Sequence, residues 1–185
     1  MMIHQAQPEV VFVPGYYGDI ALIARQARQF SITQPLLGGD GWDAPELWEL
    51  GGDALNDSYI SSHYSAESNS QAVQTFVRDY KQRYGNLIPD AHAALAYDAT
   101  RVLADAIRRA GSTESALLRD ALAETKKFPG VTGEITIDAE RNAVKPAVVL
   151  KLSDGRNQYQ ETIHPDSATA GAHSPSPAKP SRPGA

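Results

Sequence analysis

The sequence predicts an α/β fold with a doubly wound parallel sheet. Residues 10–13 (Val-Val-Phe-Val) are continuously apolar and mostly β-branched, which is typical of a strand buried on both faces of a parallel sheet. Residues 20–30 then repeat apolar side chains at helical spacing. Short strands at 36–37 and 58–61 flank a second helix, for which Asp43 is the expected N-cap. This alternation of strands and helices indicates a right-handed doubly wound unit.

The middle of the chain is predicted to form long helices. Apolar residues form one stripe between 73 and 84 and another between 95 and 110. Asp90 is the expected N-cap of the second of these helices, and Gly111 is its expected stop. A shorter helix is expected around 117–122. The β segments expected after these helices are residues 133–138, 147–152 and 158–163.

Composition and charge exclude several classes of function. The chain has 185 residues and a net charge of -5, without a Lys/Arg cluster, so nucleic acid is not an expected partner. It has no cysteine, which removes disulfides, thiolate nucleophiles and Cys-based zinc sites. The histidines lack metal-ligand spacing, and neither a G-x-S-x-G elbow nor a nucleotide-binding glycine motif occurs. We therefore expect a protein that is not an enzyme and uses no metal or cofactor.

Several blocks of residues resemble, in order, type I periplasmic binding proteins of the branched-chain amino-acid group that serves ABC transporters. The blocks are residues 12–19 (FVPGYYGD), 25–28 (RQAR), 38–42 (GGDGW), 97–99 (YDA), 128–133 (FPGVTG) and 145–149 (KPAVV). Family members have two α/β lobes with the solute in the cleft between them. The resemblance implies a partial type I periplasmic binding protein fold that comprises the later half of this architecture.

The resemblance also implies a division of the chain into four segments. Residues 8–64 correspond to the C-terminal part of ligand-binding lobe 2, and residues 65–145 to a helical segment that completes lobe 1. Residues 146–163 are expected to be closing strands that cross between the lobes. Residues 164–185 are rich in Pro, Ser and Ala and lack large apolar side chains after residue 164, so we expect a disordered tail.

Residues at the ends of the predicted strands are the candidates for ligand contact. Ligands of doubly wound folds bind outside the carboxyl ends of parallel strands, where Tyr16 and Asp40 follow the first and second strands. Asp40 can supply an anion for a ligand ammonium, and Tyr16 can offer a ring face. The resemblance implies the same roles for an acidic and an aromatic residue at these positions. The alternatives are that Asp40 caps a turn and that Tyr16 packs within one.

Four further residues near these strand ends have less specific interpretations. Tyr17 and Trp42 are candidates for ligand contact, with core packing as the alternative for each. His63 and Tyr64 follow the third strand, and we expect them to belong to the hinge between lobes rather than to the ligand shell. The predicted ligand-binding set is therefore Tyr16, Tyr17, Asp40 and Trp42.

The function implied by the resemblance is capture of a branched-chain or related amino acid between two lobes. The chain would be a truncated form of the solute-binding component of an ABC importer, with a membrane permease as the partner of full-length relatives. Two alternatives remain: a ligand-sensing receptor-type domain of the same fold, and a non-functional truncated reading frame. The resemblance implies a periplasmic location. Residues 1–5 lack the features of an export signal, which leaves a cytoplasmic location open.

Overall fold

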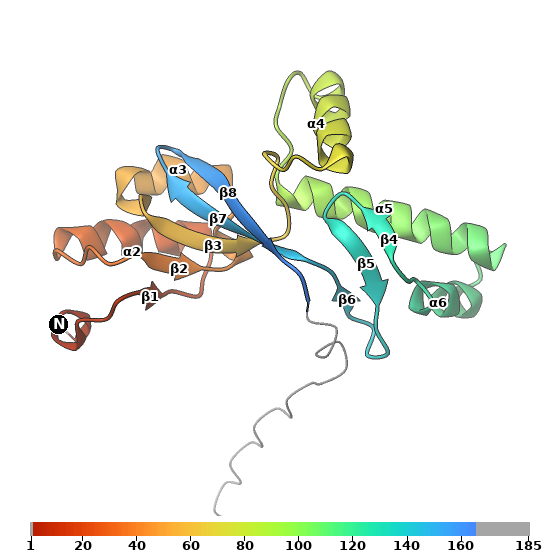
Figure 1. Ribbon diagram of the computed structural model, residues 1–185, viewed down its shortest axis with the longest axis horizontal. Coiled ribbons are helices and arrows are strands. Elements are labelled where there is room, and N and C mark those ends of the chain that lie inside the picture. The colour runs from red at the N-terminus through yellow and green to blue at the C-terminus, as the bar shows by residue number, and fades with distance from the viewer. Residues whose placement is uncertain (1, 166–185) are drawn as a thin grey trace, which may run out of the picture.

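A computed structural model describes residues 2–165 of the chain and shows two bodies joined at a narrow junction (Figure 1). The first body contains a five-stranded sheet with helices, and the second contains three helices and a three-stranded antiparallel sheet. A short helix, α1 (Met2–Ala6), precedes the first body. Residues 166–185, which make up most of the predicted disordered tail, lie outside the described residues.

The five-stranded sheet has the strand order β1-β2-β3-β7-β8. Strands β1, β2 and β3 are parallel, whereas β7 pairs antiparallel with both β3 and β8. The predicted α/β class and the parallel arrangement of the first three strands are therefore confirmed, and two antiparallel strands extend the sheet. The strand bounds are β1 (Val11–Phe12), β2 (Leu36–Gly38), β3 (Ser58–Ser62), β7 (Ala147–Ser153) and β8 (Arg156–Ile163).

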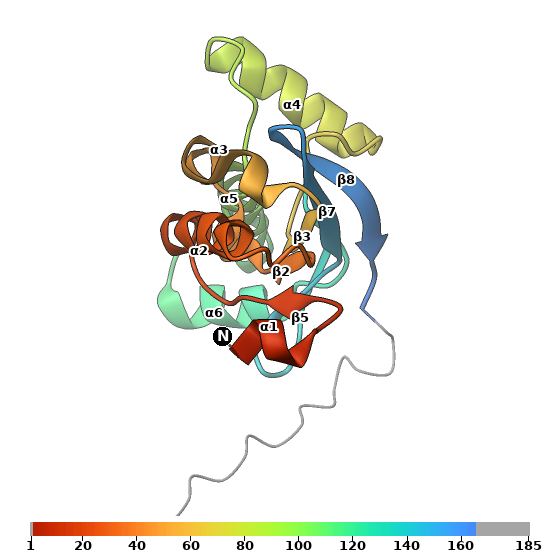
Figure 2. The same ribbon diagram turned by 90° about the vertical axis from the view of Figure 1, so that its left-hand side faces the viewer.

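Helices α2 (Tyr17–Gln29) and α3 (Pro45–Gly51) lie on one face of this sheet (Figure 2). The predicted apolar stripe of α2 is confirmed at Ile20 and Ala24, which are buried in the core of the first body. It is wrong at Ile23 and Phe30, which are exposed. Two short 3₁₀ helices, η1 (Asp40–Trp42) and η2 (Gly52–Leu55), flank α3. The core of this body therefore lies between the sheet and the two helices.

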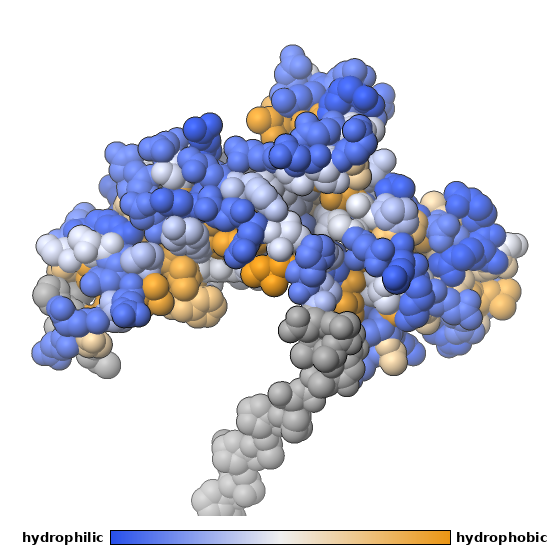
Figure 3. Space-filling view, in the orientation of Figure 1, coloured by the Kyte–Doolittle hydropathy of each residue, from blue (hydrophilic) through white to orange (hydrophobic). Residues whose placement is uncertain are grey.

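The prediction that residues 10–13 form a strand buried on both faces is wrong. Strand β1 has only two residues, and it is an edge strand whose single neighbour is β2. The side chain of Phe12 is 67% exposed, and Val10 is also exposed. Figure 3 shows apolar surface on the lower side of the first body. Residues 10–13 are apolar, but the described residues include no second strand beside β1 that would bury them.

Asp43 has a different role from the predicted N-cap. The N-cap of α3 is Ala44, which makes no side-chain capping bond. The carboxylate of Asp43 instead accepts hydrogen bonds from Ser62 Oγ at 2.6 Å and from Asn157 Nδ2 at 2.8 Å. Burial raises the pKa of Asp43. Asp43 therefore ties the start of α3 to strands β3 and β8.

The second body confirms the predicted helices and both predicted helix ends. Asp90 caps α5 because its Oδ1 accepts the N–H of Ala93 at 2.7 Å. Gly111 ends α5 with a φ of 62°, a left-handed conformation that favours glycine. The elements are α4 (Gln71–Arg83), α5 (Ala91–Ala110), α6 (Ser115–Ala123), β4 (Phe128–Gly130), β5 (Gly133–Ile137) and β6 (Ala143–Val144).

A buried carboxylate fixes the turn between β4 and β5 to helix α5. Asp98 is 1% exposed and accepts the backbone N–H groups of Val131 and Thr132, each at 2.8 Å. A Cβ at Gly130 would lie 2.6 Å from Asp98 Oδ2, so only glycine allows this close approach. The turn and α5 therefore form one unit.

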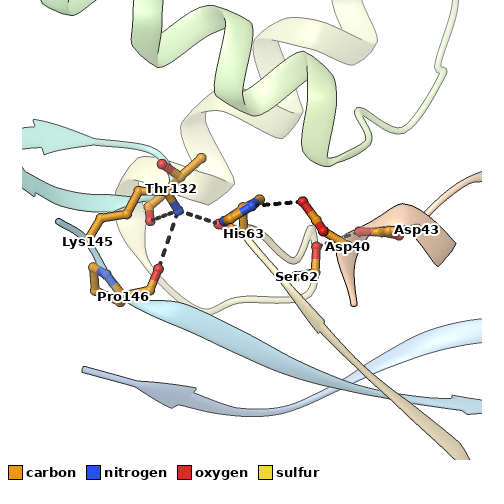
Figure 4. Close-up of polar contacts among 7 residues, drawn as sticks. All are labelled: Asp40, Asp43, Ser62, His63, Thr132, Lys145 and Pro146. Carbon is orange, nitrogen blue, oxygen red and sulfur yellow. Dashed lines mark hydrogen bonds and ion pairs between the residues drawn. The ribbon is translucent and has the colours of Figure 1, made fainter. Parts of the chain in front are cut away.

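The junction between the bodies consists of the segments that follow β3 and precede β7. The Lys145 ammonium donates to the backbone carbonyls of His63 at 3.4 Å, Thr132 at 3.5 Å and Pro146 at 3.3 Å (Figure 4). Burial lowers the pKa of Lys145. The proposed division into lobe segments stays a prediction, although β7 and β8 both pair within the sheet of the first body. Within residues 2–165, no helix combines the length and apolarity that a membrane span requires.

We expect Gly38→Ala to destabilise the first body. A Cβ at Gly38 would lie 2.2 Å from Trp42 Cε2, and overpacking of this kind costs about 1–3 kcal/mol. Gly39→Ala is the matched control, because a Cβ there meets nothing within 4 Å. Urea unfolding of the three proteins measures the difference in the free energy of unfolding. Equal values for Gly38→Ala and Gly39→Ala would contradict the packing described here.

We expect Asp98→Asn to lower the free energy of unfolding by about 1–3 kcal/mol. The amide keeps one acceptor oxygen and turns an NH₂ group toward backbone donors, which leaves a buried N–H without a partner. Asp105→Asn on the same helix is the control, because Asp105 forms partly exposed ion pairs with Arg108 and Arg109, and such pairs contribute about 0–1 kcal/mol. Thermal and urea unfolding should separate the two variants. If Asp98→Asn were as stable as the control, the claim that this carboxylate fixes the turn between β4 and β5 to α5 would be contradicted.

Candidate functional site

The carboxyl ends of the three parallel strands meet at one edge of the first sheet. Tyr16 follows β1, Asp40 follows β2 and His63 follows β3. Parallel neighbours lie about 4.8 Å apart, so residues at adjacent strand ends can converge on one small molecule. In Figure 1 this edge of the sheet points toward the second body. The sequence-based expectation that the strand ends would gather the candidate residues thus has a geometric basis.

The turns that carry Tyr16 and Asp40 are packed against each other. Tyr16 is the N-cap of α2, and its side chain is largely exposed. A Cβ at Gly41 would lie 2.7 Å from the Gly15 carbonyl oxygen and 3.2 Å from Tyr16 Cδ1. Only glycine at position 41 allows this approach without a shift of the backbone. The structure therefore brings Tyr16 and the Asp40 turn together.

Asp40 is the first residue of η1, and its side chain is 64% exposed. Its Oδ2 lies 3.1 Å from Nε2 of His63 (Figure 4). Within residues 2–165, its other carboxylate oxygen, Oδ1, makes no hydrogen bond to the protein. One carboxylate oxygen of Asp40 therefore contacts His63, and the other has no partner among the described residues.

Trp42 has the core role that is its alternative interpretation, and it is not available at the surface as a ligand contact. Its side chain is fully buried in the first body. The indole ring lies against the backbone of Gly38, and its Nε1 donates to the Val13 carbonyl at 3.2 Å. Trp42 can support the site from beneath, but a ligand at the surface cannot reach it. Tyr17, at the first turn of α2, remains partly exposed beside Tyr16.

His63 was assigned to the hinge in the sequence-based prediction, but its imidazole contacts Asp40. The signal that could have found it is positional, because His63 and Asp40 follow neighbouring parallel strands. Its backbone does belong to the junction, where its carbonyl accepts from Lys145. Tyr64 is buried in the core of the second body, with its ring centroid 6.1 Å from that of Phe76, and burial raises its pKa.

One hollow lies at the junction and another on the second body. The first, of about 590 Å³, is lined by residues of both bodies, among them His63, Thr132 and Tyr159. A larger groove of about 980 Å³ lies between α4 and α5. Neither hollow is lined by any member of the predicted ligand-binding set. The first has the size of a small-molecule pocket and is close to the pair formed by His63 and Asp40.

The chemistry of this edge suits binding of a cation. A solvent-facing carboxylate can accept a charge-assisted hydrogen bond from an ammonium group, and an adjacent aromatic face can contact the cation or an apolar body. Within the described part of the chain, no three His, Asp or Glu side chains come together as a metal site.

The chain is similar to known proteins over most of its length. A family model described as "Periplasmic binding protein" matches residues 2–157. Leu/Ile/Val-binding protein homolog 3 of Brucella melitensis is 28% identical over 156 residues, which are 83% of this chain and 42% of that protein. Leu/Ile/Val-binding protein BraC3 of Rhizobium johnstonii is 28% identical over 135 residues, which are 72% of this chain and 36% of that protein.

Two solved structures share the fold at higher sequence identity. The leucine binding protein LivK from Thermotoga maritima is 40% identical with a TM-score of 0.84, and the match covers 89% of this chain and 47% of that one. LivJ from Streptococcus pneumoniae, solved in complex with isoleucine, is 33% identical with a TM-score of 0.77, and the match covers 85% of this chain and 45% of that one. The chain thus spans less than half the length of the relatives that it matches. With the family model extending over most of its length, the chain belongs to the periplasmic binding proteins.

Proposed function

We propose that this chain supplies one wall of a binding site for a branched-chain or related amino acid, as part of the solute-binding component of an ABC importer. The observation that carries the proposal is the free oxygen of Asp40 beside Tyr16 at the carboxyl ends of β1 and β2. The relative LivJ was solved with isoleucine, which supports the same class of solute.

An α-amino acid needs three kinds of contact: an anion for its ammonium, donors for its carboxylate and an apolar wall for its side chain. Asp40 meets the first need through a charge-assisted hydrogen bond. Tyr16, with Tyr17 next to it, offers an aromatic surface for the ammonium or for the aliphatic side chain. The resemblance implies that the donors for the carboxylate belong to the opposite lobe of the family fold. Residues 2–165 therefore account for the cationic end of the solute.

We infer that capture takes place in the periplasm and is followed by delivery to a membrane permease. This inference is drawn from the family, whose members are periplasmic substrate-binding proteins. Capture requires binding and release only, and the groups gathered at the site are suited to those steps. The chemistry of transport then belongs to the permease.

We expect Asp40→Asn to weaken leucine binding by about 0.5–1 kcal/mol, because an exposed ion pair is worth about 0–1 kcal/mol. The binding of the chain itself is expected to be weak, with a dissociation constant of about ten millimolar or more, since one exposed ion pair and one aromatic face fall short of the about 4.1 kcal/mol that a millimolar dissociation constant requires. An NMR titration with leucine, followed at the backbone amides of residues 15–18 and 39–42, measures both affinities.

Asp53→Asn is the matched control, since it removes the same charge from an exposed position on η2. The leucine analogue 4-methylpentanoate, which lacks the ammonium group and is an anion, should bind the wild type no more tightly than Asp40→Asn. The proposal fails if leucine causes no saturable shifts at these amides. It also fails if Asp40→Asn and Asp53→Asn bind leucine alike.

A further inference from the structure

His63 holds one oxygen of the carboxylate that the proposed function assigns to the ammonium of the solute. The contact joins Nε2 to Asp40 Oδ2 at 3.1 Å, and the two side chains are 38% and 64% exposed. A pair this open to solvent adds little to fold stability. The contact is therefore better explained by what it does to the charge of Asp40 than by what it adds to the fold.

We propose that His63 is a specificity-determining residue that makes capture of an ammonium group at Asp40 dependent on pH. This inference rests on the proposed function. Imidazole is the side chain whose ordinary charge change falls between pH 5 and 8. A neutral His63 donates one N–H to Asp40 and leaves the carboxylate its negative charge.

Protonation of His63 changes the charge that a solute meets at Asp40. An imidazolium in contact with the carboxylate cancels the charge that attracts the solute and repels a second cation at the same place. Asp40 Oδ1 stays free in either state, so the position for the ammonium persists while its attraction changes. Binding of a cationic group should thus weaken as pH falls through the histidine range.

Other charged groups surround His63, and each comes from a different element. Lys145, which precedes β7, donates to the His63 carbonyl at 3.4 Å and adds positive charge at the junction. Glu134 of β5 and His164, which follows β8, line the same hollow as His63. None of these three side chains forms a hydrogen bond or ion pair with Asp40 within residues 2–165. Within residues 2–165, the side chain that contacts the Asp40 carboxylate directly is therefore that of His63.

Asp43 is a second acid close to this site, and it must be separated from Asp40 in any pH experiment. Burial raises its pKa, and its carboxylate is held by Ser62 and Asn157 rather than by His63. His92 acts on Asp43 through charge alone. Asp43→Asn removes this acid, but it also disturbs the start of α3, so it is less suitable as a control than a histidine variant.

The test is an NMR titration of the full chain with leucine at pH 5.5 and pH 7.5, about one unit on either side of the ordinary histidine pKa. Free leucine keeps both of its charges at these two values. We expect the wild type to bind roughly three- to tenfold more weakly at pH 5.5, the size of a Coulomb interaction between partly screened unit charges. His63→Gln keeps a donor near Asp40 but cannot become charged, so its affinity should be equal at both pH values. His164→Gln should behave as the wild type.

The possible results separate this inference from the proposed function. An absence of leucine binding by the wild type at both pH values overturns the proposed function and this inference with it. Binding that is equally strong at both values in the wild type overturns the inference alone. A fall in affinity that persists in His63→Gln, or that disappears in His164→Gln, also overturns it, because another group would then be responsible.

Discussion

The packing of Trp42 on the backbone of Gly38 is the constraint on which the site depends. The indole is fully buried, and its N–H reaches across to the Val13 carbonyl at the end of β1. One side chain thus joins the ends of two neighbouring strands from beneath. With these ends fixed, Gly41 can meet the Gly15 carbonyl, and the turns of Tyr16 and Asp40 come together above the core. The surface residues that we assign to the solute are therefore positioned by a residue that the solute does not touch.

The junction between the two bodies depends on a second set of contacts, in which Thr132 is central. Its backbone N–H donates to the buried Asp98, while its carbonyl accepts from the half-buried Lys145 ammonium. The peptide groups around Thr132 thus lie between an anion and a cation, with their donors toward one and an acceptor toward the other. Lys145 also binds the carbonyl of His63, whose side chain contacts Asp40. A continuous path of polar contacts therefore leads from α5 through the junction to the proposed site.

Local patterns in the sequence predicted the elements well where local interactions decide them. The capping of α5 by Asp90 and its end at Gly111 follow from residues within one turn of the helix. Asp43 has the same local pattern, but its partners are Ser62 and Asn157, which are distant in sequence, so the cap prediction failed. The exposure of Phe12 and the burial of Trp42 also depend on which strand lies at the edge of the sheet. A short window of sequence does not specify which strand lies at the edge of the sheet.

The central claim is that Asp40 and Tyr16 receive the cationic end of an amino acid. A crystal structure of the chain grown with a high concentration of leucine tests this claim most directly. The account predicts the leucine ammonium within hydrogen-bond distance of Asp40 Oδ1, with the ligand against the ring of Tyr16. Leucine bound instead in the groove between α4 and α5, or with its ammonium away from Asp40, would contradict the account.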